Sequence, residues 1–226
     1  MCLNLLFNKM DQWLINSEVF IHPFNCIISG RTMCGKTFFL KEVLSYRNIL
    51  FDTIPNKIYF CYKSWQKTYD DFKAIIPNIV FIKGLLDIED LNATNVNMII
   101  FDDLMKECIE SESVMNIFTV GSHHKNTSTF FLSQNLFSQG KFSRDISLNA
   151  NYLIIFRNPR DLQQIQVLAR QMFPNNSKFL IESFYDSTIK AHGYLLIDLK
   201  QTTESRNRIQ TGILPDQKRI IYVPKS

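Results

Sequence analysis

The sequence predicts an α/β fold in three layers, with helices covering both faces of a mainly parallel sheet. Three observations support this. The strand candidates are short apolar runs without polar alternation, as expected of strands that are buried on both faces. They alternate with segments of helical periodicity, which is the element order of a parallel sheet with crossover helices. A glycine-rich turn at residues 30–37 joins the first strand of the domain to its first helix.

Length and composition fit one domain with a sizeable core. The chain has 226 residues, of which 46% are hydrophobic, and a chain of that length can bury most of its apolar side chains in one core. We predict an N-terminal segment at residues 1–22 and a single domain at residues 23–226. The formal net charge of +4 allows a polyanionic partner without requiring one.

The cysteines, the histidines and the apolar runs bear on the cellular compartment, on metal binding and on membrane insertion. The five cysteines form no C-x-x-C pair, and Cys26 and Cys61 lie inside apolar strand candidates, which favours a reducing compartment. His123 and His124 are a weak zinc candidate, because adjacent residues rarely supply two ligands. No apolar run reaches the length of a membrane span, and the N-terminus lacks the basic start of a signal peptide. We therefore expect a soluble, intracellular protein with no membrane partner.

The strands are predicted in the following order. The N-terminal segment is expected to hold an amphipathic helix around residues 10–15 and then a short strand. The apolar run at residues 24–29 is the first strand of the domain. Later strands are predicted where β-branched and aromatic residues gather between turn residues, at residues 57–62, 78–83, 96–101, 128–132, 151–156, 193–198 and 219–223.

Helices are predicted where apolar residues recur at helical spacing, at residues 38–47, 65–76, 113–120, 161–173 and 178–185. Gly121 is placed to cap the end of the third of these helices. Asp161 is placed to cap the start of the fourth. The polar stretch at residues 200–208 is the expected flexible loop.

The glycine-rich turn matches the phosphate-binding pattern G-x-x-x-x-G-K-[S/T] without a gap. Backbone N–H groups of such a loop surround a phosphate, and the positive end of the following helix faces the same anion. Lys36 is expected to reach the β- and γ-phosphates of ATP, and the Thr37 hydroxyl to ligate Mg²⁺. The alternative, a plain glycine turn, is disfavoured by the flanking strand and helix. The expected nucleotide-binding residues are Gly30, Arg31, Thr32, Met33, Cys34, Gly35, Lys36 and Thr37.

Two adjacent acids follow the buried strand at residues 96–101. Asp102 is expected to hold Mg²⁺ together with Thr37, through water. Asp103 stands where many ATPases carry a second acid that orients and deprotonates the attacking water. Glutamate is commoner at that position, so Asp103 has a shorter reach. The alternative is an Asp-Asp turn with no catalytic role, which the upstream phosphate loop disfavours.

A polar sensor is expected on a further strand. The candidate strand at residues 78–83 separates the phosphate loop from the acidic strand along the chain. That layout fits ATPases in which an additional strand lies between the two motif strands. Such enzymes carry a polar residue at the end of the next strand, and Gln134 has that position. Its amide is expected to hold the water or the γ-phosphate; a solvent-facing role is the alternative.

Hydrolysis also needs a positive charge on the phosphoryl group that is transferred. Ring ATPases often take this charge from a neighbouring subunit, as an arginine finger. Arg144 is the first choice, because it precedes the strand at residues 151–156. Arg157, Arg160 and Lys125 are the alternatives, and each of the four is also a candidate surface or DNA-facing cation.

Taken together, these motifs resemble those of the viral genome-packaging ATPases of the FtsK–HerA branch, most of all the ATPases of adintoviruses and Polinton/Maverick elements. The block from Gly121 to Pro174 is the most specific part of the likeness, which extends from about residue 24 to the C-terminus. The residues that carry it lie at positions 29–37, 99–105, 121–125, 131–137, 146–149, 156–161, 168–174 and 193–198.

This resemblance implies a P-loop NTPase sheet of the RecA-like, additional-strand type. It also implies a motor that uses ATP and Mg²⁺ to drive double-stranded DNA into a preformed capsid. It implies a ring homo-oligomer that contacts DNA independently of sequence and docks on a capsid or portal-vertex protein, in the host nucleus or at a viral assembly site. Loops that carry Lys125, Lys141 and Arg144 are expected to face the DNA channel. The pair Asp102-Asp103 departs from the Asp-Glu of many FtsK-type motors, which weakens the assignment of the base.

Two other functions stay open. A nucleoside or nucleotide kinase would suit the length and the phosphate loop, but a kinase needs an arginine-rich lid over its acceptor, and the sequence has no compact segment of that kind. A non-motor nucleotide-binding assembly protein, or a decayed ATPase, would not need the full set of catalytic residues. Lys36, Thr37, Asp102 and Asp103 are all intact, which argues against decay.

Overall fold

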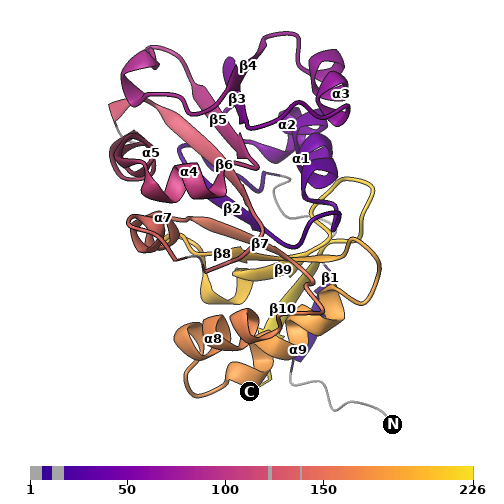
Figure 1. Ribbon diagram of the computed structural model, residues 1–226. Helices are drawn as coiled ribbons and strands as arrows, with labels where there is room; N and C mark the ends of the chain where they lie inside the picture. Colours follow the sequence, from indigo (N-terminus) through magenta and orange to yellow (C-terminus); the bar gives the residue numbers. More distant parts are fainter. Residues whose placement is uncertain (1–6, 12–17, 122–123, 138, 226) are drawn as a thin grey trace.

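The predicted α/β fold is confirmed by the computed structural model, which describes residues 7–11, 18–121, 124–137 and 139–225. A single mixed sheet forms the middle layer of the molecule, in the strand order β1-β10-β9-β8-β7-β2-β6-β5-β3-β4 (Figure 1). The strands from β7 to β4 in this order run parallel. The strands from β1 to β8 are added antiparallel at the other side.

The sheet therefore has two halves of different construction. The parallel half consists of β2 (Asn25–Ser29), β3 (Lys57–Tyr62), β4 (Ile79–Lys83), β5 (Asn97–Asp102), β6 (Thr127–Ser133) and β7 (Tyr152–Phe156). The antiparallel half consists of β1 (Phe7–Asp11), β8 (Tyr194–Asp198), β9 (Ile209–Thr211) and β10 (Ile220–Pro224).

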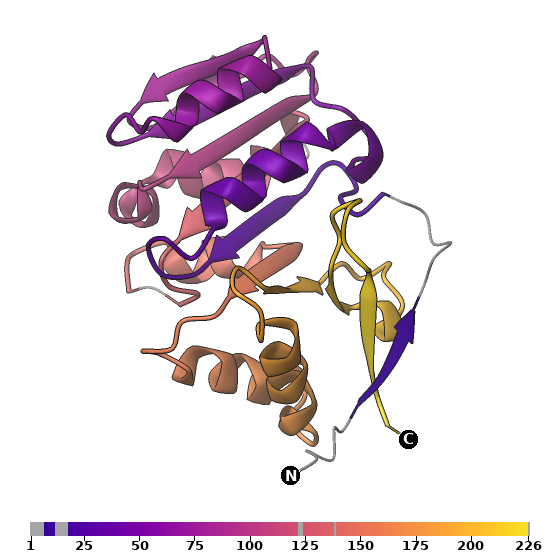
Figure 2. The same cartoon turned by 90° about the vertical axis from the view of Figure 1, so that its right-hand side faces the viewer.

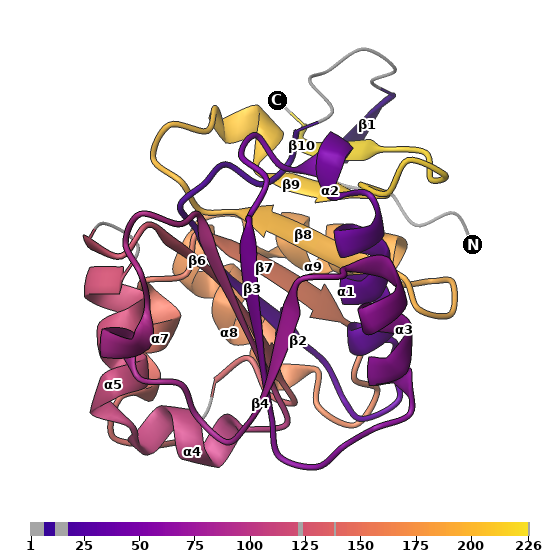
Figure 3. The ribbon, with the colours of Figure 1, turned by 90° about the horizontal axis from the view of Figure 1, so that it is seen from above.

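Helices cover both faces of the sheet (Figure 3). One core lies between the sheet and the helices α1 (Lys36–Ser45), α2 (Arg47–Leu50) and α3 (Thr68–Ile75). The other lies between the sheet and the helices α4 (Met105–Glu110), α5 (Glu112–Asn116), α7 (Ser143–Leu148), α8 (Gln163–Met172) and α9 (Ser177–Ser187).

The strands supply side chains to both cores, because successive side chains of a strand point to opposite faces. In β2, Ile27 belongs to the core of α4 to α9, while Cys26 and Ile28 belong to the core of α1 to α3. Both faces are therefore apolar, which explains why the strand sequences show no polar alternation.

The strand that lies between the two motif strands is not the one that the chain order suggested. β6 lies between β2 and β5, with Ile27 and Phe101 both opposite Phe131. The candidate at residues 78–83, observed as β4, is at the outer edge of the sheet. The additional-strand layout is therefore present, but β6 provides it. Because parallel strands end at the same edge, the carboxyl ends of β2, β5 and β6 meet there.

Several predicted boundaries were wrong. Met10 and Asp11 belong to strand β1 and not to a helix; the rest of the expected helix at residues 12–15 lies outside the described residues. The helix expected to end at Gly121 becomes a π-helical turn at Ile117–Gly121. Gly121 is not among the glycines with a positive φ, so it does not form the expected left-handed cap.

The short elements α4, α7 and β9 were not predicted at all.

The N-terminal segment also contributes to the common sheet and core. β1 pairs with β10 over its whole length, and Phe20 is fully buried, with its ring stacked on Phe24 and edge-on to Tyr152. A domain boundary at residue 22 would therefore separate β1 from the sheet to which it belongs. No helix formed by the described residues is both long enough and apolar enough to cross a membrane.

Candidate functional site at the phosphate loop

The phosphate loop connects β2 to α1 and depends on its two glycines. The Gly30 N–H donates to the Ser133 carbonyl over 3.1 Å, which ties the loop to the end of β6. A Cβ on Gly30 would lie 2.6 Å from the Cys34 Sγ and 2.7 Å from the Phe156 Cβ, so no larger residue fits. Gly35 immediately precedes α1 and has a φ of 107°, a conformation that only glycine adopts readily.

Lys36 is the first residue of α1 and folds back over the loop. Its Nζ donates to the carbonyl of Gly30 over 2.5 Å and to that of Arg31 over 3.1 Å. Burial lowers the pKa of Lys36, against the opposing effect of nearby Cys34 and Asp102. Two carbonyl oxygens satisfy the ammonium less well than an anion would. Lys36 is therefore a partly desolvated cation at the start of α1, where the N-terminal end of a helix favours an anion such as phosphate.

The loop and the first acid meet through Thr37. The Thr37 Oγ1 lies 3.4 Å from the Asp102 Oδ2, and Asp102 is only 6% exposed. Burial raises the pKa of Asp102 despite hydrogen bonds from Tyr69 and Thr37 and the charge of Lys36. A buried carboxylate that lacks a close cation is stabilised by a bound cation. A hydroxyl and a carboxylate are ligands that Mg²⁺ takes while it keeps several waters, so this pair fits the ion.

Tyr69 is a site residue that the sequence analysis missed. It lies on α3, is fully buried, and its hydroxyl donates to the Asp102 Oδ2 over 3.1 Å. Burial, and then the neighbouring Asp102 carboxylate, raise the pKa of Tyr69, so it is a donor at any physiological pH. The sequence carried no signal for this contact, because α3 is far from β5 along the chain and tyrosine belongs to no motif at that position.

Asp103 and Gln134 complete the hollow in front of the loop. The hollow has a volume of about 480 Å³ and is lined by Lys36, Thr37, Asp102, Asp103 and Gln134 among others. Asp103 follows β5 in a left-handed conformation with φ 57°, which is uncommon for a residue with a side chain. This turn exposes Asp103 directly after the buried Asp102. The structure thus brings four of the five predicted catalytic side chains to one place.

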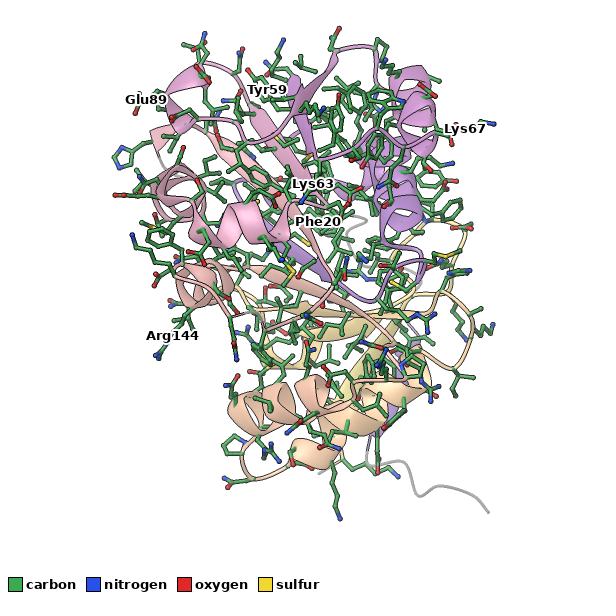
Figure 4. All side chains as sticks on the ribbon, in the orientation of Figure 1. Phe20, Tyr59, Lys63, Lys67, Glu89 and Arg144 are labelled. Atoms are coloured by element: carbon green, nitrogen blue, oxygen red, sulfur yellow. The ribbon has the colours of Figure 1, made fainter. Side chains whose placement is uncertain are left out.

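A second hollow begins at the same residues. Asp103 and Gln134 also line a space of about 530 Å³ on the side of α4. Lys63, which follows β3 and is labelled in Figure 4, forms an ion pair there with Glu107 over 2.8 Å. Asp103 and Gln134 therefore line both hollows.

The remaining cation candidates do not lie in this hollow. Arg144 is exposed on α7 and projects outward from the side of the molecule opposite α1 (Figure 4). The guanidinium of Arg157 lies 5.5 Å from the ring centre of Tyr185. Lys125 pairs with Glu89 over 3.4 Å at the beginning of β6, the edge of the sheet opposite to the loop. None of these three is among the residues that line the phosphate hollow, and neither is Arg160, the fourth candidate.

The zinc candidate is not supported by the residues that can be assessed. His123 lies outside the described residues. Among the described residues, no group of three or more His, Cys, Asp or Glu side chains is placed to hold a metal ion.

His192 is a second neighbour of the loop that the sequence analysis missed. It lies in the connection between α9 and β8, and its Nδ1 donates to the Cys34 carbonyl over 2.9 Å. A Cβ on Gly35 would lie 2.9 Å from that same nitrogen. His192 has a φ of 61°, so the turn that presents it is itself unusual. An isolated histidine before Gly193 gave no signal in the sequence.

Comparison with known proteins establishes the fold and no closer relationship. No protein-family model matches the sequence, and no curated protein matches it. Among solved structures, the genome packaging NTPase B204 from Sulfolobus turreted icosahedral virus 2, in complex with AMPPCP, is similar with a TM-score of 0.55 and 10% identity, over 84% of this chain and 96% of that chain. Its complex with ATP-gammaS gives a TM-score of 0.52 and 9% identity, over 94% and 100%.

A third structure is B204, the DNA-packaging ATPase from Sulfolobus Turreted Icosahedral Virus. It matches with a TM-score of 0.54 and 13% identity, over 91% of this chain and 100% of that one. At such identities the likeness extends to the arrangement of strands and helices and not to individual residues. The fold is that of the P-loop NTPases, with the phosphate loop, the acidic strand end and β6 in one hollow.

Proposed function

We propose that this chain is an ATP-hydrolysing motor that translocates double-stranded DNA into a preformed viral capsid. The observation that carries the proposal is the hollow in which a phosphate loop meets a buried acid, an exposed acid and an amide from three adjacent parallel strands. The likeness to the packaging NTPase B204, solved with ATP analogues, supports the same reading. We also propose that the chain is related to the FtsK–HerA packaging motors, and most closely to those of adintoviruses and Polinton/Maverick elements.

The phosphates of ATP would lie on the loop backbone. Lys36 would exchange its two carbonyl partners for the β- and γ-phosphate oxygens, a stronger charge-assisted interaction. Thr37 and Asp102 would hold Mg²⁺, which neutralises charge on the phosphate oxygens when it is bound. Tyr69 would fix the carboxylate of Asp102 by donating to its Oδ2, the oxygen that also faces Thr37.

Water attack is the reaction that the remaining residues favour. Asp103 is an exposed carboxylate that can accept the proton of the attacking water, and the Gln134 amide can orient that water or the γ-phosphate. A kinase would need to exclude water from this point, whereas Asp103 and Gln134 border two open hollows. Hydrolysis is therefore favoured over phosphoryl transfer to a bound acceptor.

The partners of the proposed motor follow from its task. Arg144 projects away from its own loop, as required of a finger that serves a neighbouring subunit in a ring. Contacts to DNA would be made to phosphate, since a translocase must ignore sequence. Lys125, Lys141 and Arg144 are the candidate cations, and a capsid or portal-vertex protein is the docking partner.

Steady-state ATP hydrolysis by the purified chain, with and without linear duplex DNA, tests the proposal. Several-fold stimulation by duplex DNA that is lost at high salt is the expected result, because phosphate contacts weaken as salt rises. Lys36→Ala should remove both the basal and the stimulated rate. Hydrolysis that is indifferent to DNA would contradict an autonomous motor, and phosphate transfer to an added nucleoside monophosphate would favour a kinase.

A further inference from the structure

The loop that follows β6 carries Gln134 and is tied to the rest of the molecule on both sides of that residue. On one side, the Ser133 carbonyl accepts from the Gly30 N–H over 3.1 Å, which joins the end of β6 to the phosphate loop. On the other side, the Leu136 N–H donates to the Gln164 Oε1 over 2.6 Å. The Gln134 side chain is exposed and has no hydrogen-bond partner in the part of the chain that the structure describes. Its position therefore follows from that of the backbone around it.

Gln164 lies on α8 and is held at both ends of its amide. Its Oε1 also accepts from the Phe137 N–H over 3.4 Å. Its Nε2 donates to the Asp161 Oδ2 over 2.5 Å and to the Asn135 Oδ1 over 3.4 Å. Helix α8 is fixed in turn, because Ile165 is buried in the core that α9 shares. Figure 2 shows α8 and α9 side by side, at the end of the molecule opposite α3. Gln164 thus connects a packed helix to the loop that carries Gln134.

Gln134 and Gln164 also border one small space. Its volume is about 20 Å³, and Gly30, Asp161 and Phe184 belong to the same lining. A space of this size has room for about one water molecule. The phosphate loop, the backbone at Gln134 and the first turn of α8 are therefore packed closely, so that a shift of one is transmitted to the others.

We propose that Gln164 is a positioning residue for ATP hydrolysis, whose amide holds the loop after β6 so that Gln134 reaches the attacking water or the γ-phosphate. The inference rests on the proposed function, because Gln134 has this task only if ATP is hydrolysed in the phosphate hollow. Gln164 is not among the residues that line that hollow. A misplacement of about 1 Å can lower a rate about 100-fold. The effect of Gln164 should therefore appear in the rate of hydrolysis and not in the binding of the other phosphates.

The alternative is that Gln164 only stabilises the start of α8. It lies three residues after Asp161, a spacing at which two side chains can cap a helix together. The Asp161 Oδ1 does accept from the Gln163 N–H over 3.2 Å. A cap of this kind does not need the Leu136 and Phe137 N–H groups, which belong to another segment of the chain. The contact of Gln164 with both of them favours the positioning role.

The test separates the rate of hydrolysis from the binding of nucleotide. Steady-state hydrolysis of ATP with Mg²⁺ and duplex DNA gives kcat and KM, and isothermal titration calorimetry gives the Kd of ADP. Gln164→Ala should lower kcat about tenfold. It should leave the Kd of ADP within about twofold, because ADP has no γ-phosphate for Gln134 to meet. Gln163→Ala changes the exposed neighbouring glutamine of α8 and is the matched control, in which neither value should change.

A paired substitution tests the hydrogen bonds themselves. Gln164→Glu keeps an acceptor for the Leu136 N–H but places a second carboxylate against Asp161, so kcat should fall. Asp161→Asn in the same chain turns that neighbour into a donor and keeps an oxygen for the Gln163 N–H. The double variant should therefore recover kcat to within about threefold of wild type.

The outcomes distinguish this inference from the proposed function. A wild-type chain that hydrolyses no ATP would contradict the proposed function, and this inference with it. If the wild-type chain hydrolyses ATP, three results would each overturn the role of Gln164 alone: an unchanged kcat in Gln164→Ala, a loss of ADP affinity as large as the loss of kcat, or no recovery in the double variant. A thermal melt of each variant shows whether it is folded; if Gln164→Ala is not, the comparison of Gln164→Glu with the double variant decides.

Discussion

The two halves of the sheet differ in how they contribute to the site. In the parallel half, the predicted residues of the phosphate hollow lie at the carboxyl ends of strands: the loop follows β2, Asp102 ends β5 and Asp103 follows it, and Gln134 follows β6. In the antiparallel half, His192 reaches the loop from the connection between α9 and β8, through its hydrogen bond to the Cys34 carbonyl. A motif therefore predicts the residues that would meet a phosphate, because phosphate chemistry is shared by many proteins, whereas a contact such as that of His192 belongs to no motif.

The largest effect is expected in the parallel half, at the buried acid. Asp102→Asn keeps the shape of the side chain and its contact with Tyr69 but removes the charge that would hold Mg²⁺. We expect the rate of ATP hydrolysis to fall about 100-fold or more, as it does when an electrostatic contact to the reacting group is lost. Steady-state assays with saturating Mg²⁺ measure this. A rate within threefold of wild type would contradict the role of Asp102 as a ligand of Mg²⁺.

Tyr69→Phe should have an intermediate effect. It removes only the hydroxyl that positions the Asp102 Oδ2, and the buried ring keeps its packing. Because residues that orient a metal ligand typically contribute about 10- to 100-fold in affinity or activity, we expect the Mg²⁺ concentration for half-maximal hydrolysis to rise about tenfold. ATP binding in the presence of EDTA should stay the same. Tyr59→Phe, on the neighbouring strand β3, is the matched control; a loss there of equal size would point to a general packing effect.

The metal-free protein should be more stable without the charge of Asp102. Burial raises the pKa of this group, so the folded state holds its proton to higher pH than the unfolded chain. Stability therefore falls as the pH rises from the ordinary aspartate value of about 3.9 through the raised value, and the loss is complete above it. Asp102→Asn should raise the melting temperature at neutral pH, by about 2–4 °C for each kcal/mol recovered, and less near pH 4. An unchanged or lower melting temperature at pH 7 in EDTA would contradict this.

The last prediction concerns the thiol of Cys34, within the loop itself. Cys34 is half-buried next to Gly30, and burial raises the pKa of its thiol, so alkylation should accelerate as the pH becomes alkaline. ATP at ten times its dissociation constant should slow the reaction about tenfold by mass action, as followed by mass spectrometry of the modified peptide. The buried Cys26 and Cys108 serve as internal references. Equal rates with and without ATP would place the nucleotide elsewhere.

The sequence could predict most of the parallel half, because its strands are continuous apolar runs and its site residues lie at the ends of those runs in known motifs. The strand at Lys57–Tyr62 was predicted with its observed limits. The short helices α4 and α7 have too few residues to show a period. Tyr69 and His192 act through contacts with residues far away in the chain, and the neighbour of β2 was misjudged because chain order does not give spatial order.

The central claim is that the phosphates of a nucleotide lie on the loop after β2, with Mg²⁺ held by Thr37 and Asp102. Binding of inorganic tripolyphosphate, measured by isothermal titration calorimetry with and without Mg²⁺, tests this most directly, because the ligand consists of phosphates alone. We predict binding to the wild-type chain that Mg²⁺ strengthens, that Lys36→Ala abolishes, and that loses its dependence on Mg²⁺ in Asp102→Asn. Equal affinities of the wild-type chain and Lys36→Ala would contradict the account.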